Sequence, residues 1–174
     1  MTNKMYLLVP LVVLISTGIA FGGVSIFKKV TAPEKAHYHA GFQIYVDGKL
    51  KDFAKQEYMK ETPCAADDAQ VHVDEQLEKA HLHDLAGNVV HSHRKKAIWE
   101  DLFTNIKYSL DQGKPVKSYI NGQEVDNIET QQIQPYDSVV ILIGKNNDIK
   151  TYLPKAVTKS EIEKEEKKSE NCGT

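Results

Sequence analysis

The sequence predicts an α+β protein: a mixed β-sheet with one main amphipathic helix, preceded by a single N-terminal transmembrane helix. Three observations support this class. Short alternating apolar and polar segments flank Asp47-Gly48 and Asn121-Gly122, which are pairs typical of tight hairpins. Apolar residues recur at helical spacing between residues 97 and 112. The run 6–27 contains no charged side chain and is long enough to span a bilayer.

These patterns divide the chain into five parts. We expect a short N-terminal tail (1–5), a transmembrane anchor (6–27), a linker (28–36), a histidine-rich α+β domain (37–148) and a charged tail (149–174). A cleaved signal peptide is the alternative for the apolar run, because Gly18-Ile19-Ala20 supplies small residues at a plausible cleavage site.

The topology of the anchor depends on the charges at its two ends. Lys28 and Lys29 favour a cytoplasmic domain, whereas a short N-terminal tail before a single span usually gives the opposite orientation. We expect an uncleaved signal-anchor in the cell membrane, with the domain on the extracytoplasmic side.

Composition narrows the range of functions. The chain has 174 residues, a formal net charge of −2 and 41% hydrophobic residues, so we expect one core and no nucleic-acid partner. All seven histidines lie between residues 37 and 93. The two cysteines, Cys64 and Cys172, do not make a disulfide-rich scaffold, and whether they pair is left open.

The first half of the domain alternates between apolar and polar positions. The apolar face of a strand at 37–46 leaves His37 and His39 on the opposite, outward face. After the Asp47-Gly48 turn we expect a return strand at 49–53, a short helix at 54–59 and a strand at 70–74. In that last strand His72 and Asp74 would face outward.

Residues 80–93 read as a β-hairpin with a His-x-His pair in each arm. Asp84 suits the first position of a type I turn, and Gly87 suits a position with positive φ. In the resulting register His81 lies opposite His91. Four imidazoles then share one outward face (His81, His83, His91 and His93), and Leu82 and Val90 share the buried one.

The second half supplies the helix and the remaining strands. A helix at 97–112 should bury an apolar stripe and end at Gly113. Strands at 116–120 and 124–128 should flank Asn121-Gly122, and the apolar run 139–143 should be a central strand. We expect the core to include Trp99, Leu102, Phe103, Ile106, Ile141 and Ile143. The charged tail should be an exposed helix or disordered.

From residue 80 onward the expected order is hairpin, amphipathic helix, hairpin and strand. With Tyr-Ile-Asn-Gly-Gln-Glu-Val at 119–125 and Tyr-Asp-Ser-Val-Val-Ile-Leu-Ile-Gly at 136–144, this order resembles a β-grasp (ubiquitin-like) domain over residues 80–144. The ending is similar to that of sulfur-carrier proteins, but a sulfur-carrier function is not implied, because the chain continues past Gly144. The whole chain also resembles small membrane-anchored, histidine-rich extracytoplasmic proteins.

Clustered His-x-His pairs point to metal binding, because neutral imidazole is a good ligand for Cu²⁺ and Zn²⁺. Facing residues on neighbouring strands are close enough to share one ion. The predicted ligands are His81, His83, His91, His93, His37 and His39, with His72, Asp74 and Cys64 as weaker candidates. A copper or zinc ion is expected, and both one and two ions are open.

We therefore expect a membrane-anchored, extracytoplasmic metal-binding protein whose partners are the metal ion and the membrane. The alternative is an accessory or scaffold subunit of a membrane protein complex, with the histidine face at an interface. The sequence contains no His-Glu-x-x-His, nucleophile-elbow or phosphate-loop motif, so it favours a binding protein over an enzyme and leaves catalysis open.

Overall fold

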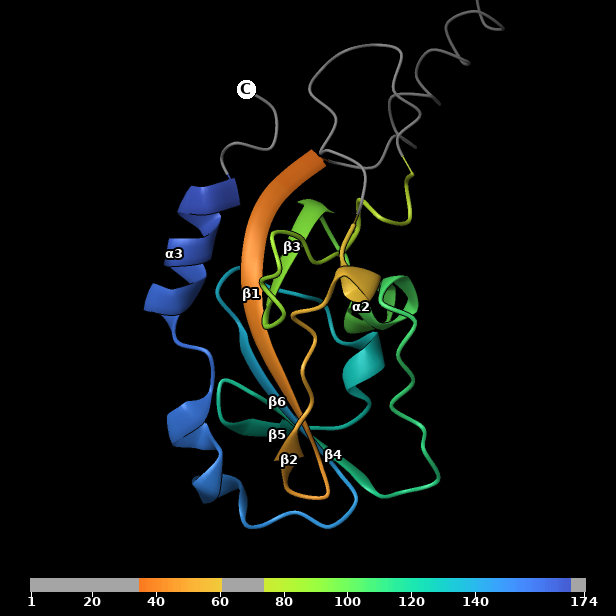
Figure 1. Ribbon diagram of the computed structural model, residues 1–174, viewed down its shortest axis with the longest axis vertical. Helices are drawn as coiled ribbons and strands as arrows, with labels where there is room; N and C mark the ends of the chain where they lie inside the picture. The colour runs from red at the N-terminus through yellow and green to blue at the C-terminus, as the bar shows by residue number, and fades with distance from the viewer. Residues whose placement is uncertain (1–34, 61–73, 170–174) are drawn as a thin grey trace, which may run out of the picture. The chain divides into compact units, whose positions relative to one another are not determined.

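A mixed six-stranded sheet forms the centre of the computed structural model, which describes residues 35–60 and 74–169 (Figure 1). The strands run in the order β2-β1-β6-β4-β5, and β3 also pairs with β1. Their bounds are β1 Lys35–Val46, β2 Lys49–Leu50, β3 Val89–Arg94, β4 Val116–Ile120, β5 Gln123–Val125 and β6 Ser138–Ile143. The α+β class with a mixed sheet is therefore confirmed.

The described residues include no helix with the length and apolar character that a bilayer span requires. The expected anchor at 6–27 lies outside the described residues.

The long strand β1 organises the sheet. One edge of β1 runs parallel to β6, with Phe42 opposite Val139. The other edge pairs antiparallel with β3 at one end and with β2 at the other. Asp47 and Gly48 both have positive φ, as do Asn121 and Gly122, so both predicted hairpin turns are confirmed. Strand β6 lies between β1 and β4 and is central, as expected.

Several elements are shorter than the patterns predicted. The return strand after Gly48 covers only Lys49–Leu50, and the helix expected at 54–59 is the 3₁₀ turn η1, Gln56–Tyr58. The strand expected at 124–128 is β5, and Ile128 instead begins the 3₁₀ turn η2, Ile128–Thr130. Most of the strand expected at 70–74 lies outside the described residues.

The main helix is also much shorter than predicted. Helix α2 spans only Trp99–Asn105, not 97–112. Lys107 adopts a positive φ of 53°, its N–H donates to the Thr104 carbonyl, and the Tyr108 N–H donates to the Phe103 carbonyl. These two bonds form a Schellman motif, which ends the helix well before Gly113.

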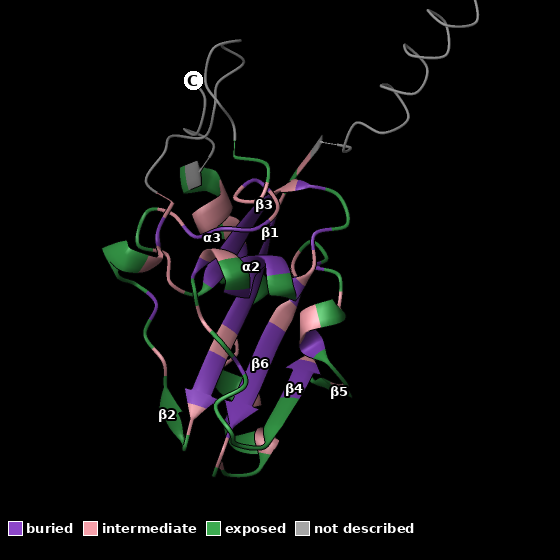
Figure 2. Cartoon of the chain, turned by 90° about the vertical axis from the view of Figure 1, so that its right-hand side faces the viewer, coloured by how far each residue is buried: buried purple, intermediate pink, exposed green. Residues whose placement is uncertain are grey.

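One face of the sheet carries the main apolar core (Figure 2). Phe42 and Ile44 of β1 and Ile141 of β6 pack there against α2, with Trp99 and Leu102 fully buried. All six predicted core residues are buried, namely Trp99, Leu102, Phe103, Ile106, Ile141 and Ile143. Leu82 and Val90 are buried as well. This confirms which side of each strand faces the hydrophobic core.

The opposite face of the sheet is covered by the C-terminal segment. Two 3₁₀ turns, η3 (Ile149–Thr151) and η4 (Leu153–Lys155), lead to helix α3, Lys159–Ser169, which packs on β1 (Figure 1). The predicted tail is therefore a helix with a buried side: Ile162 is 0% exposed. At Gly41 a β-carbon would collide with Val157, so this glycine allows the segment before α3 to lie against the sheet.

Candidate metal centre

Three stretches of chain bring six histidines together on the α3 side of the sheet. Strand β1 supplies two histidines, β3 supplies two, and residues 81–83 supply two more, giving His37, His39, His91, His93, His81 and His83. His39 is the register partner of His91 in the β1–β3 pair. His81 and His91 exchange two backbone hydrogen bonds of 2.9 Å, so the predicted register of the two arms is confirmed.

The turn between the two arms differs from the prediction. Asp84 and Leu85 have positive φ values of 53° and 58°, whereas Gly87 does not. The Ala86 N–H donates to the His83 carbonyl. A β-carbon on Gly87 would overlap the backbone of Phe53 and Ala54, so this glycine is needed for close packing rather than for its φ angle.

The centre of the histidine face is buried, so the prediction that these side chains point outward to solvent is wrong for His39, His81 and His91. His83 and His93 are half-buried, and His37 is exposed as predicted. The exposed fractions of His39, His81 and His91 are 2%, 1% and 0%. The alternation of the strands correctly separated two faces, but α3 covers the second one. Glu166 of α3 lies 3.9 Å from His39 Nδ1.

The cluster contains two groups of three histidines that could each hold a metal ion. One group is His37, His39 and His91, and the other is His81, His83 and His91. Within each group the possible ligand atoms all lie within 4.8 Å of one another. Imidazole nitrogens at such distances can converge on one ion with small side-chain adjustments, because a Zn–N bond is about 2.0–2.1 Å long.

His81 is oriented as a metal ligand is. Its Nδ1 lies 2.7 Å from the carbonyl oxygen of Leu77. A carbonyl can only accept, so Nδ1 carries the proton and Nε2 carries the lone pair. That Nε2 is buried and has no hydrogen-bond partner among the described residues. A carbonyl behind one ring nitrogen, with the other nitrogen left open, is the usual arrangement of a metal-binding histidine.

The other rings form a chain of short contacts. His83 Nδ1 lies 2.7 Å from the Asp84 carboxylate, which again leaves Nε2 as the acceptor. That Nε2 lies 2.6 Å from His91 Nδ1, and His91 Nε2 lies 2.7 Å from His93 Nε2. Each contact therefore joins one N–H to one lone pair, and the chain is satisfied with every ring neutral.

Burial keeps the central rings neutral. Loss of hydration lowers the pKa of His39 to about 3 and that of His93 to about 4, and neighbouring histidines lower the pKa of His39 further. The pKa values of His81 and His91 are also lowered, first by burial and then by the nearby charges of Lys60 and of other histidines. Neutral imidazole is the form that binds metal.

A buried ionic network holds the segment that presents the Leu77 carbonyl. Lys60 Nζ lies 2.6 Å from Glu78 Oε1, and both side chains are less than 10% exposed. Arg94 at the end of β3 contacts Glu75 at 2.9 Å, and the His93 N–H donates to the Glu78 carbonyl. This network fixes residues 75–79 against β3 and so fixes the acceptor behind His81.

Asp74, one of the weaker candidates, belongs to neither group of histidines. Asp74 is exposed, and its carboxylate accepts hydrogen bonds from the N–H groups of Gln76 and Leu77, so it caps the turn beside the site. His72 and Cys64 lie outside the described residues, as does Cys172.

Two contacts of the site could not be read from the sequence. The Leu77 carbonyl is a backbone group in an irregular turn, and no residue pattern marks it. Glu166 lies in the charged C-terminal segment, where apolar residues such as Val157 and Ile162 among the charged ones were the available signal of a packed face. Asp84 was predicted as a turn residue, and its contact with His83 adds a second role.

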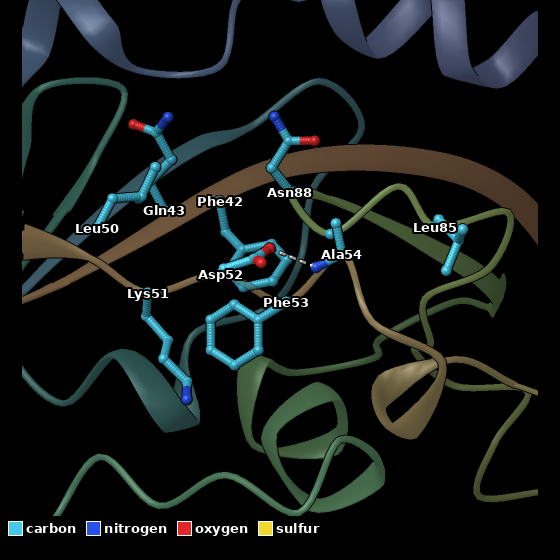
Figure 3. A pocket seen from close by; sticks show the side chains of 10 residues that line it. Phe42, Gln43, Leu50, Lys51, Asp52, Phe53, Ala54, Leu85 and Asn88 are labelled. Atoms are coloured by element: carbon cyan, nitrogen blue, oxygen red, sulfur yellow. Dashed lines mark hydrogen bonds between the residues drawn. The ribbon is translucent and has the colours of Figure 1, made fainter.

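A separate cavity of about 330 Å³ lies between β2 and the turn 85–88 (Figure 3). Its walls include the rings of Phe42 and Phe53 and the exposed side chains of Leu50 and Leu85. None of the residues that line it is a histidine, so the cavity is not part of the candidate metal centre.

The function of this site is inferred from its own residues and geometry. Comparisons with protein-family models, with curated proteins and with solved structures give no match.

Proposed function

We propose that this protein binds a copper or zinc ion through the buried histidine cluster, as a membrane-anchored protein with its domain outside the cytoplasm. The observation that carries the metal proposal is His81. Its Nε2 is a buried lone pair without a hydrogen-bond partner in the described part of the chain, and its ring offers a nitrogen within 4.8 Å of ligand atoms of His83 and His91. An unpaired buried acceptor is unfavourable unless something binds it.

The ligand chemistry selects the class of metal. Imidazole nitrogen suits Zn²⁺ and Cu²⁺, whereas Mg²⁺ and Ca²⁺ prefer oxygen ligands. His39 lies against the chain's own α3, where Glu166 is 3.9 Å from its Nδ1. That observation favours a metal centre over the alternative in which the histidine face lies against another subunit.

The direct test is metal titration of the full-length chain, with His81→Ala as the variant and Val89→Ala as its control. Val89 is buried on the same face and belongs to β3, but it offers no ligand. We expect tight Zn²⁺ or Cu²⁺ binding by the wild type and by Val89→Ala. His81→Ala should bind the ion of the group His81, His83 and His91 at least tenfold more weakly. Binding of equal strength in all three proteins would remove the cluster as the site.

Anchoring and topology rest on the uncharged run 6–27. Its length matches the hydrocarbon thickness of a bilayer. Protease added to intact cells should digest the domain while leaving cytoplasmic proteins untouched. A domain that is digested only after lysis would place the metal centre on the cytoplasmic side, without affecting the metal proposal.

We also propose that the domain has a β-grasp fold. The support is the sheet order β2-β1-β6-β4-β5, with β1 parallel to β6 and with α2 following β3 in the chain. The parallel partner of β6 begins at Lys35, so the fold would extend N-terminal to the range 80–144 on which the resemblance was based. An experimental structure of residues 35–169 tests this, since a different strand order would exclude it.

A further inference from the structure

We propose that His91 bridges two metal ions, with one ion on each nitrogen of its ring. This inference rests on the proposed function and deepens it, because it sets the number of ions and makes the centre dinuclear. The first ion would bind His81, His83 and His91, and the second would bind His37, His39 and His91, with His93 beside them.

The grouping of the histidines is the first argument. His91 is the one residue that the two groups have in common, and the other members of each group come from different elements. His81 and His83 belong to the segment before the turn, whereas His37 and His39 belong to β1. His91, on β3 between them, is 0% exposed, so its ring is enclosed by the two groups.

The orientation of the His91 ring is the second argument. Its Nδ1 lies 2.6 Å from His83 Nε2, and its Nε2 lies 2.7 Å from His93 Nε2. The two lone-pair directions of an imidazole diverge in the ring plane, so one ion cannot be held by both nitrogens. The Nδ1 of His91 therefore faces a ligand of the first ion, and its Nε2 faces His93, which we place beside the second ion.

The number of ligands is the third argument. Six imidazoles exceed the three or four nitrogen ligands that one zinc or copper ion needs. Sharing His91 gives each ion three histidine ligands from the two groups, and His93 is available to the second ion. The ring centroids of His37 and His39 lie 4.7 Å and 4.5 Å from that of His91, which keeps both close to the bridging ring.

The bridge requires one proton to leave. A neutral His91 has one N–H and one lone pair, and the first ion binds the lone pair on Nδ1 after the proton moves to Nε2. The second ion then forms a bond to Nε2 as the N–H bond breaks, and the proton passes to water. No electron is transferred in either step.

The test is a titration of the full-length chain with Cu²⁺, followed by electron paramagnetic resonance. Two Cu²⁺ ions joined by an imidazolate couple magnetically, so the signal should rise up to one equivalent and then fall as the second equivalent binds. His83→Ala and His37→Ala should each retain one ion with an uncoupled signal, and Val89→Ala should behave like the wild type.

Each outcome separates the two proposals. A wild type that binds one ion, or whose signal doubles at two equivalents, overturns the bridge but leaves the metal-binding function standing. Loss of all binding in both His83→Ala and His37→Ala indicates a single mononuclear site and also overturns the bridge. A wild type that binds no metal overturns the proposed function itself.

Discussion

The two faces of the β1–β3 pair are both buried, but they are built from different chemistry. The face under α2 is hydrocarbon and aromatic, with Phe42 and Trp99 at its centre. The face under α3 holds His39 and His91, together with the apolar contact of Val89 with Ile162. Burial of the apolar face under α2 lowers the free energy of the folded state at any pH. Burial of the histidine face under α3 is favourable only when the rings are neutral and their nitrogens are paired.

The two faces should differ most in how their contributions to the free energy of unfolding change as the pH falls. The His39 pKa is lowered to about 3 by burial, so between that value and the unfolded pKa of about 6.5 the unfolded chain binds more protons than the folded one. The contribution of the neutral His39 to the free energy of unfolding is therefore at its maximum above about pH 6.5, and it falls as the pH drops below that value. The loss should reach about 2 kcal/mol at pH 5 for each histidine that stays neutral in the fold.

Urea unfolding of the metal-free chain at pH 7, 6 and 5 measures this loss. The carboxylates of Asp47 and Glu161 have lowered pKa values, so their contribution disappears only in stronger acid and does not confuse the comparison. An unfolding free energy that stays constant from pH 7 to pH 5 would show that the histidines are hydrated in solution.

Leu102→Ala tests the apolar face. Leu102 is fully buried between α2 and the sheet, so the substitution should reduce the free energy of unfolding by about 2–5 kcal/mol. Thr104→Ala is the control, because Thr104 is an exposed residue of the same helix. Chemical denaturation of both variants gives the comparison, and a midpoint equal to that of the wild type would mean that α2 is not packed on the sheet.

Ile162→Ala tests the cover over the histidine face. Ile162 is the fully buried residue of α3, and its loss should reduce stability by about 2 kcal/mol, at the lower end for such changes because a surface helix can readjust. The same variant should make the histidines more reactive toward an imidazole-modifying reagent. Lys164→Ala, at an exposed position of α3, should change neither property, and equal reactivity in all forms would indicate that α3 does not shield the cluster.

Asp84→Asn is expected to have the smallest effect on the fold. Asp84 accepts from His83 Nδ1, so the amide should weaken metal affinity by about 10–100-fold through the loss of ring orientation and basicity. Asparagine tolerates the positive φ at this position, so the unfolding free energy of the metal-free chain should hardly change. Isothermal titration with Zn²⁺ measures the affinity, and an unchanged value would exclude Asp84 from the support of His83.

Patterns of local origin predicted much of this molecule. The hairpin turns at Asp47-Gly48 and Asn121-Gly122 depend on the φ angles of adjacent residues, and the opposition of His81 and His91 follows from alternation along two short arms. The length of α2 was overestimated because apolar spacing continues past Asn105, while the Schellman motif at Lys107 ends the helix. A lysine does not favour a positive φ, so the residue type at position 107 does not predict the end of the helix.

Residue alternation along the strands specifies which residues share a face, because side-chain direction in a strand has a period of two. It therefore placed His39, His81 and His91 opposite the apolar positions of their own strands, with Leu82 and Val90 on the other side. The burial of His39, His81 and His91 follows from long-range packing, to which α3 contributes by packing on β1 from far along the chain. In the folded chain the two nitrogens of His91 face different neighbours, and His81 Nε2 has no hydrogen-bond partner in the described residues.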